Sequence, residues 1–136
     1  AGLAGRIQSS FCFLIIFRLA VMSVSSVLSQ LMQTIQDRKA NPPPRSYTTS
    51  LFQGGVDKIG EKITEEAAEV IEAAAEALDP QHNEGRAHLV HEAADLLYHL
   101  LVMLGHCDIE LSEVEAELAG RFGISGLDEK ASRQTE

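Results

Sequence analysis

Two pairs of acidic residues, each spaced three apart, are the part of this sequence best suited to chemistry. The first pair is Glu66 and Glu69, and the second is Glu92 and Asp95. An α-helix turns about 100° per residue, so this spacing puts both carboxylates of a pair on one side of a helix. If two such helices face each other, the carboxylates need a counter-charge, and the pattern predicts a divalent metal site.

The chemistry of these side chains indicates which metal the site would take. An oxygen-only ligand set favours Mg²⁺, with Mn²⁺ as the alternative, over Zn²⁺. A di-iron bundle would need Glu-x-x-His pairs, whereas here the third position after each leading Glu is acidic. The nearby Glu72 and Glu76 are interpreted as a solvated face. His88 and His99 share the polar ridge of the second pair and are interpreted mainly as structural, with ligation or proton transfer the less favoured role.

Two lysines and two glycines before the first acidic pair each allow two interpretations. Lys58 and Lys62 precede Glu66 by about two turns and one turn. They are either salt-bridge partners of neighbouring acidic residues or groups that hold phosphate oxygens beside a metal. Gly54 and Gly55 either form a simple turn or let backbone N–H groups approach a phosphate. The sequence leaves both questions open.

The spacing of apolar residues predicts the elements that must position these side chains. We expect helices over residues 23–40, 56–78, 86–107 and 113–122, with a loop over residues 41–55. Ser23 or Ser25 is the candidate cap of the first helix, and Ser112 that of the last. No window has the alternation of a strand, and no internal repeat is present. The expected architecture is therefore all-α, a bundle of about four helices.

The third expected helix differs from the others because it is apolar on nearly every side. Only a narrow polar ridge interrupts it, so this helix should be buried and its acidic residues should face protein. One small bundle could hardly cover such a helix. We therefore expect a homo-oligomer, either a dimer or a tetramer.

Composition limits the class of protein and its surroundings. A chain of 136 residues fits one domain, and its net charge of −9 argues against a general nucleic-acid binder. An anionic substrate stays possible, because a metal ion and a few basic residues can reverse the field in one pocket. Cys12 and Cys107 form no disulfide framework, which fits the reducing cytoplasm. The apolar run over residues 11–17 is too short to span a bilayer, so no membrane partner is expected.

Residues 1–21 differ in character from the rest, since they contain no acidic residue. They are interpreted as an extraneous or disordered leader, for example from a start site placed too early, with a targeting segment as the alternative. Residues 22–136 are expected to form one all-α domain.

Several longer motifs extend the acidic pairs. They are residues 46–51 (SYTTSL), 54–62 (GGVDKIGEK), 96–101 (LLYHLL) and 125–133 (SGLDEKASR). Taken together, they resemble the phosphoribosyl-ATP pyrophosphohydrolase family of histidine biosynthesis, over about residues 25–133. The acidic pairs alone would indicate only the wider superfamily of MazG-like all-α nucleoside triphosphate pyrophosphohydrolases.

The resemblance implies a function and assigns roles to residues. The reaction would be hydrolysis of 1-(5-phosphoribosyl)-ATP to 1-(5-phosphoribosyl)-AMP and pyrophosphate. It implies that Mg²⁺ is bound by the carboxylates of Glu66, Glu69, Glu92 and Asp95. Glu65 is the candidate for orienting or deprotonating the attacking water. The candidates for phosphate contacts are Gly55, Lys58, Lys62, Lys130 and Arg133.

Two other functions stay open at this point. One is a house-cleaning pyrophosphohydrolase that acts on free nucleoside triphosphates with the same metal chemistry, because metal ligands do not determine the substrate. The other is a non-catalytic acidic helical module that uses the apolar third helix to bind a partner.

Overall fold

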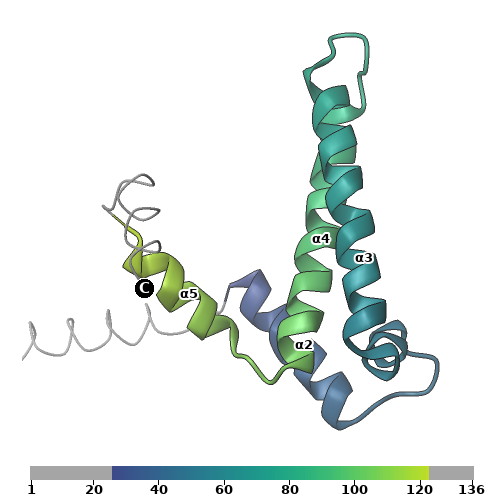
Figure 1. Cartoon of the computed structure of the whole chain (residues 1–136). Coiled ribbons are helices and arrows are strands. Elements are labelled where there is room, and N and C mark those ends of the chain that lie inside the picture. The colour runs from purple at the N-terminus through teal and green to yellow at the C-terminus, as the bar shows by residue number, and fades with distance from the viewer. Residues whose placement is uncertain (1–25, 123–136) are drawn as a thin grey trace, which may run out of the picture. The chain divides into compact units, whose positions relative to one another are not determined.

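The computed structural model describes residues 26–122, which form four helices and no strand within that range. They are α2 (Val27–Ala40), α3 (Tyr47–Leu78), α4 (Gly85–His106) and α5 (Leu111–Gly120) (Figure 1). The all-α prediction is confirmed. The expected leader over residues 1–21 lies outside the described residues, as do Lys130 and Arg133. No helix of the described part combines the length and the apolar character needed to cross a membrane.

The chain divides into two compact units after Gln30. In the first unit, the Ser26 hydroxyl oxygen accepts a hydrogen bond from the Ser29 backbone N–H at 3.1 Å. This is the geometry of a helix N-cap, so Ser26 stabilises the start of α2. The expected caps, Ser23 and Ser25, lie outside the described residues.

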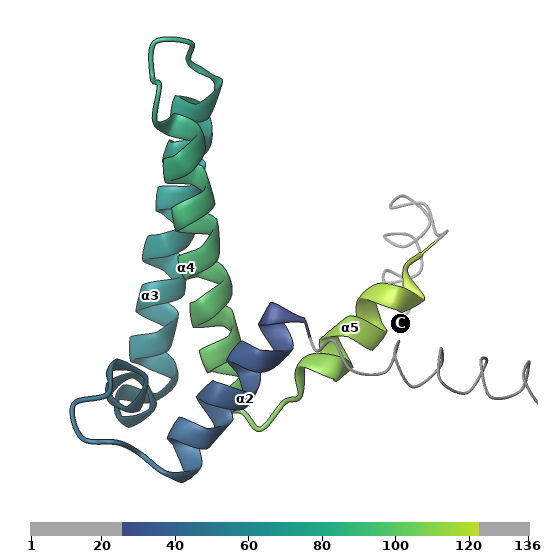
Figure 2. The ribbon, with the colours of Figure 1, turned by 180° about the vertical axis from the view of Figure 1, so that it is seen from behind.

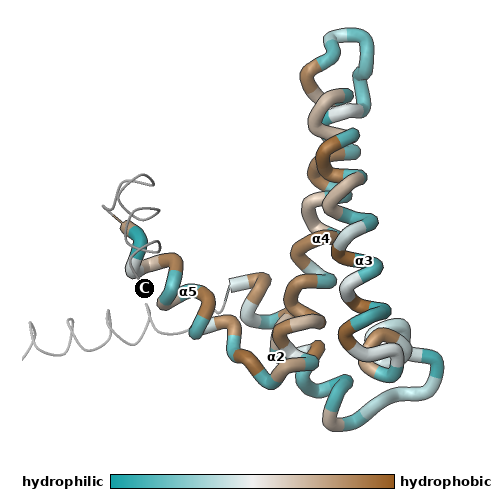
Figure 3. The backbone as a smooth tube through the Cα atoms, viewed as in Figure 1, coloured by the Kyte–Doolittle hydropathy of each residue, from teal (hydrophilic) through white to brown (hydrophobic). Residues whose placement is uncertain are grey.

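Within the second unit, α3 and α4 lie side by side as an antiparallel hairpin, which both ribbon views show (Figures 1 and 2). Asp79 ends α3, followed by Pro80, which cannot continue a helix. The turn that joins the two helices is hydrophilic, whereas apolar residues recur along α4 (Figure 3). Ile59 and Ala73 of α3 and Val102 of α4 are fully buried. The buried apolar residues are therefore aliphatic, in agreement with an aromatic content of only 5% in the sequence.

The prediction of a loop over residues 41–55 is wrong in its second half, because α3 begins at Tyr47. Ser46 is the N-cap, and its hydroxyl accepts a hydrogen bond from the Thr49 backbone N–H at 3.2 Å. The helix is interrupted only at Gly55, whose φ of 67° and ψ of −161° are not helical. Almost no residue but glycine adopts this conformation. Gly55 is thus a kink that divides α3 into a short and a long segment.

The short segment of α3 is held by a buried hydroxyl. Thr48 is fully buried, and its hydroxyl lies 2.8 Å from the Tyr98 hydroxyl of α4. The same oxygen accepts a hydrogen bond from Arg38 Nη1 of α2 at 3.1 Å. Three helices therefore meet at one threonine, which fixes the direction of the segment before the kink.

A lysine of α2 closes the end of α4. Lys39 Nζ donates to the carbonyl oxygens of Gly105 and His106 at 2.7 and 3.1 Å and pairs with Asp108 at 2.6 Å. Carbonyl groups in the last turn of a helix lack helical partners, so this ammonium group satisfies two of them.

The predicted cap of the last helix is also wrong. The N-cap of α5 is Glu110 rather than Ser112. Its side chain accepts from the backbone of Glu113, and the Glu113 carboxylate in turn accepts from the Glu110 backbone N–H at 2.9 Å. This reciprocal capping box satisfies two free donors, and it starts the helix before Ser112 is reached.

Candidate metal centre

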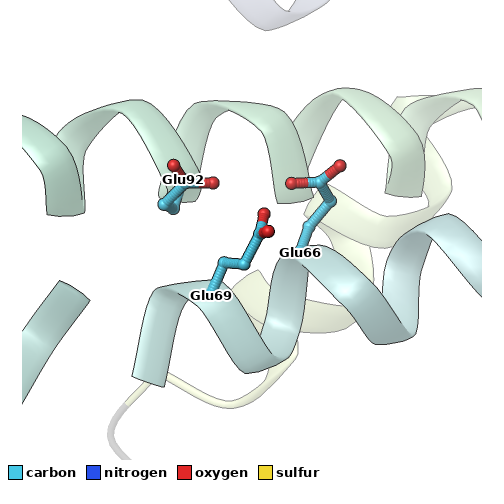
Figure 4. Close-up of side chains that lie close together, drawn as sticks. All are labelled: Glu66, Glu69 and Glu92. Carbon is cyan, nitrogen blue, oxygen red and sulfur yellow. The ribbon is translucent and has the colours of Figure 1, made fainter. Parts of the chain in front are cut away.

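Three carboxylates converge between α3 and α4. Glu66 and Glu69 extend from α3 and Glu92 from α4, and their carboxylates point toward one another (Figure 4). One oxygen of each residue lies within 4.8 Å of one oxygen of both others. Glu66 and Glu92 are only 5% and 7% exposed. Buried carboxylate oxygens that converge in this way fit a hard divalent cation, and no second group of this kind occurs within residues 26–122.

Among the described residues, Lys62 lies beside the acidic cluster, meaning Glu66, Glu69 and Glu92. Lys62 Nζ lies 3.0 Å from Glu66 Oε1 and 2.6 Å from Glu65 Oε2. Burial alone would raise the pKa of Glu66, but the hydrogen bond and charge of Lys62, together with Glu69 and His99, outweigh it, and the pKa is lowered. Glu65 and Glu66 in turn raise the pKa of Lys62. Glu66 is therefore ionised and paired.

Glu69 has the opposite electrostatic environment. Burial raises its pKa first, and the neighbouring carboxylates of Glu66 and Glu92 raise it further. The basic residues beside the cluster therefore do not fully neutralise the negative charge around Glu69. A bound cation would remove this repulsion.

Two histidines support the cluster from α4. His88 lies between Glu76 and Glu92, with Nδ1 2.7 Å from Glu76 Oε2 and Nε2 3.2 Å from Glu92 Oε1. The hydrogen bond to Glu76 is the main cause of a raised pKa at His88. The buried His99 has Nδ1 2.8 Å from the Asp95 carbonyl oxygen. A carbonyl only accepts, so His99 Nδ1 carries a proton that it donates there.

The other nitrogen of His99 connects the cluster to the segment before the kink. His99 Nε2 lies 3.0 Å from the Tyr47 hydroxyl, and His99 Nδ1 is 3.7 Å from Glu66 Oε1. A hydrogen bond between Tyr47 and His99 therefore joins the segment before the kink to α4. The Tyr47 and Tyr98 rings stack with centroids 6.4 Å apart. Sequence reasoning interprets His99 as mainly structural but misses its contacts with Tyr47 and Tyr98, although all three lie in the SYTTSL and LLYHLL motifs.

The structure separates the remaining sequence-predicted residues. Asp95 is outside the acidic cluster: its Oδ2 lies 3.4 Å from His91 Nε2, and its side chain is 44% exposed. Its role as a metal ligand stays a prediction. Glu65 is 55% exposed and paired with Lys62.

Lys58 is tied to the kink rather than to an acidic residue. Its Nζ donates to the Ser50 carbonyl oxygen at 3.3 Å. Its side chain also passes so close to Gly54 that a Cβ there would clash with it. Gly54 therefore leaves room for Lys58 over the bend at Gly55.

Comparison with known proteins identifies the family. The profile of the phosphoribosyl-ATP pyrophosphohydrolase family matches residues 28–122. A protein of Rhodopirellula baltica named phosphoribosyl-ATP pyrophosphatase is 53% identical over 106 residues, which cover 78% of this chain and 85% of the relative. Relatives of the same name from Geobacter sulfurreducens and Rhodobacter capsulatus are 49% and 48% identical, over 79% of this chain and 93% and 98% of their own lengths.

These matches span the hairpin that carries the acidic cluster and extend over most of each relative's length. The family lies within the MazG-like all-α superfamily, in agreement with the helical architecture of the described residues. The chain therefore belongs to the phosphoribosyl-ATP pyrophosphohydrolase family.

Proposed function

We propose that this chain hydrolyses 1-(5-phosphoribosyl)-ATP to 1-(5-phosphoribosyl)-AMP and pyrophosphate, an early step of L-histidine biosynthesis. The observation that carries the proposal is the convergence of Glu66, Glu69 and Glu92 within the segment that matches the family. A biosynthetic role of this kind also supports the cytoplasmic location expected from the cysteine content.

The cation of this site is proposed to be Mg²⁺, with Mn²⁺ able to replace it. Glu66, Glu69 and Glu92 would hold it, with Asp95, one turn after Glu92 on α4, as a fourth ligand. When bound, the cation would neutralise negative charge on the phosphate oxygens. The three converging carboxylates support this proposal because they offer only oxygen ligands.

The neighbouring charged residues would act on substrate and water. Lys62 Nζ lies 3.0 Å from Glu66 Oε1, and an ammonium group there can hold a phosphate oxygen. Glu65 is half exposed, so water can reach it, and it is the proposed group that orients or deprotonates the attacking water. Lys58 and the backbone of Gly55 are proposed phosphate contacts, and Lys130 and Arg133 are proposed to complete them.

The function is tested by measuring pyrophosphate release from 1-(5-phosphoribosyl)-ATP with and without Mg²⁺. We expect release that requires the divalent cation and stops when a chelator removes it. A panel of deoxynucleoside triphosphates serves as the comparison. Faster hydrolysis of any of these would contradict the proposal and favour a house-cleaning pyrophosphohydrolase. The absence of any turnover and of any Mg²⁺ binding would favour a non-catalytic module.

We also propose that the chain forms a homo-oligomer through α4. Val90, Leu97 and Leu100 are 63%, 45% and 41% exposed, and their spacing puts them on one side of the helix. Replacing Leu97 with Asp should place a charge in the buried subunit contact and dissociate it. Light scattering after gel filtration would show an oligomer for the wild type and a monomer for the variant. A monomeric wild type would contradict this proposal.

A further inference from the structure

We propose that His88 is a positioning residue that holds Glu92 in the acidic cluster by linking it to Glu76 on the opposite helix. The inference rests on the proposed metal site, although it concerns a residue outside that site. Its evidence is a set of contacts across the α3–α4 hairpin.

The first contact is the bridge itself. His88 Nδ1 lies 2.7 Å from Glu76 Oε2, and His88 Nε2 lies 3.2 Å from Glu92 Oε1. One imidazole ring therefore spans two carboxylates, one on α3 and one on α4. Glu92 is only 7% exposed, so its orientation depends on protein groups more than on water. Within residues 26–122, the ring is a basic group in contact with the Glu92 carboxylate, so it can fix that orientation.

The second contact explains how the ring reaches across. A Cβ added at Gly85 would lie 2.6 Å from both the carbonyl carbon and the carbonyl oxygen of Glu76. The first residue of α4, Gly85, therefore packs directly against the backbone of α3 at Glu76. Only glycine allows so close an approach.

Spacing along α4 connects this approach to the cluster. Gly85, His88 and Glu92 are separated by three and four residues, so all three lie on one side of the helix. The contact at Gly85 sets the distance between the helices, and His88 then meets Glu76. One turn further along, Glu92 reaches Glu66 and Glu69. All three residues therefore lie on the side of α4 that faces α3.

A purely electrostatic role for His88 makes the opposite prediction. If the ring only supplied positive charge beside Glu92, its removal would leave the site more negative and tighten Mg²⁺ binding. If the ring fixes the orientation of Glu92, its removal should weaken Mg²⁺ binding. Loss of such a supporting partner lowers metal affinity by about 10- to 100-fold. The sign of the change therefore separates the two roles.

The experiment measures Mg²⁺ affinity calorimetrically in the full chain, without substrate. We expect His88→Ala and Glu76→Ala each to weaken binding about tenfold, and the double variant to be no weaker than either alone. Glu76→Gln keeps an oxygen that accepts from His88 Nδ1, so it should weaken Mg²⁺ binding less than Glu76→Ala does. His82→Ala is the matched control, because His82 lies on the exposed turn and pairs with Asp79. That variant should bind Mg²⁺ as the wild type does.

The outcomes distinguish this inference from the proposed function. Unchanged or tighter Mg²⁺ binding by His88→Ala, or equal effects of Glu76→Ala and Glu76→Gln, would overturn the positioning role. If Glu69→Gln also left Mg²⁺ binding intact, the proposed metal site itself would be wrong. In turnover assays, the positioning role predicts that His88→Ala needs more Mg²⁺ for activity but recovers kcat at saturating Mg²⁺.

Discussion

Replacing Glu69 with Gln should reduce pyrophosphate release by on the order of 10²- to 10³-fold, while the metal-free protein becomes more stable than the wild type. The loss of activity follows because Glu69 provides one of the three converging carboxylates. The gain in stability has an electrostatic cause. The pKa of Glu69 is raised by burial and by Glu66 and Glu92, so its charge destabilises the folded state above its unfolded-state pKa.

Glutamine has nearly the same shape but no charge, so it removes that repulsion without leaving a cavity. Thermal unfolding in a chelator should show a higher Tm for Glu69→Gln than for the wild type. Addition of Mg²⁺ should raise the Tm of the wild type much more than that of the variant, because a ligand that binds only the folded state stabilises it. The two results have opposite signs, and an ordinary structural role for Glu69 would not produce both.

Glu72→Gln is the matched control for this experiment. Glu72 is exposed, lies one turn after Glu69 on α3 and is not part of the acidic cluster. The same chemical change there should leave turnover, Mg²⁺ response and Tm unaltered. If Glu69→Gln retained wild-type activity, or if Glu72→Gln matched its effects, the cluster would not be the site of catalysis.

The sequence predicts the acidic cluster in part, and helix geometry explains the limit. Spacing of three places Glu92 and Asp95 on the same side of α4, but about 60° apart around its axis. The crossing of α3 and α4 decides which of them meets the opposite helix. Glu92 does so, whereas Asp95 lies beside His91. Which of the two carboxylates faces α3 depends on tertiary packing, which cannot be predicted from local spacing in the sequence.

Helix boundaries show the same division between local and tertiary causes. The third expected helix differs from α4 by one residue at each end, because a long apolar segment bounded by polar residues is a strong signal. The sequence predicts a loop for the segment of α3 before the kink, because Gly54-Gly55 is typical of a turn. Ser46 is a local capping signal that could have revealed it. The bridge from Glu76 through His88 joins residues on two helices, and no spacing rule predicts it.

The Gly55→Ala variant should lower the free energy of unfolding by about 1–3 kcal/mol, the usual cost of a side chain in this backbone conformation. Gly55 has φ 67° and ψ −161°, and a Cβ there meets no neighbour within 4 Å. The cost would therefore come from the backbone and not from a clash. Chemical denaturation of wild type and variant, with equal m-values, would measure it.

Gly60→Ala is the matched control, since Gly60 lies in the same helix and its added Cβ also meets nothing within 4 Å. Its φ is not positive, so alanine should stabilise the protein there by roughly 0.5–1 kcal/mol. Identical substitutions five residues apart are thus expected to have opposite signs. Equal effects at both positions would mean that the kink is not a feature of the folded protein.

The kink also determines what activity Gly55→Ala should retain. A straightened α3 would carry Tyr47 away from His99 and Thr48 away from Tyr98, which breaks the hydrogen bonds of 3.0 and 2.8 Å between them. His99 lies 3.7 Å from Glu66, so the loss would extend to the acidic cluster. Pyrophosphate release should therefore fall in Gly55→Ala and be unchanged in Gly60→Ala. Full activity in a destabilised Gly55→Ala variant would show that the kink contributes to stability but not to catalysis.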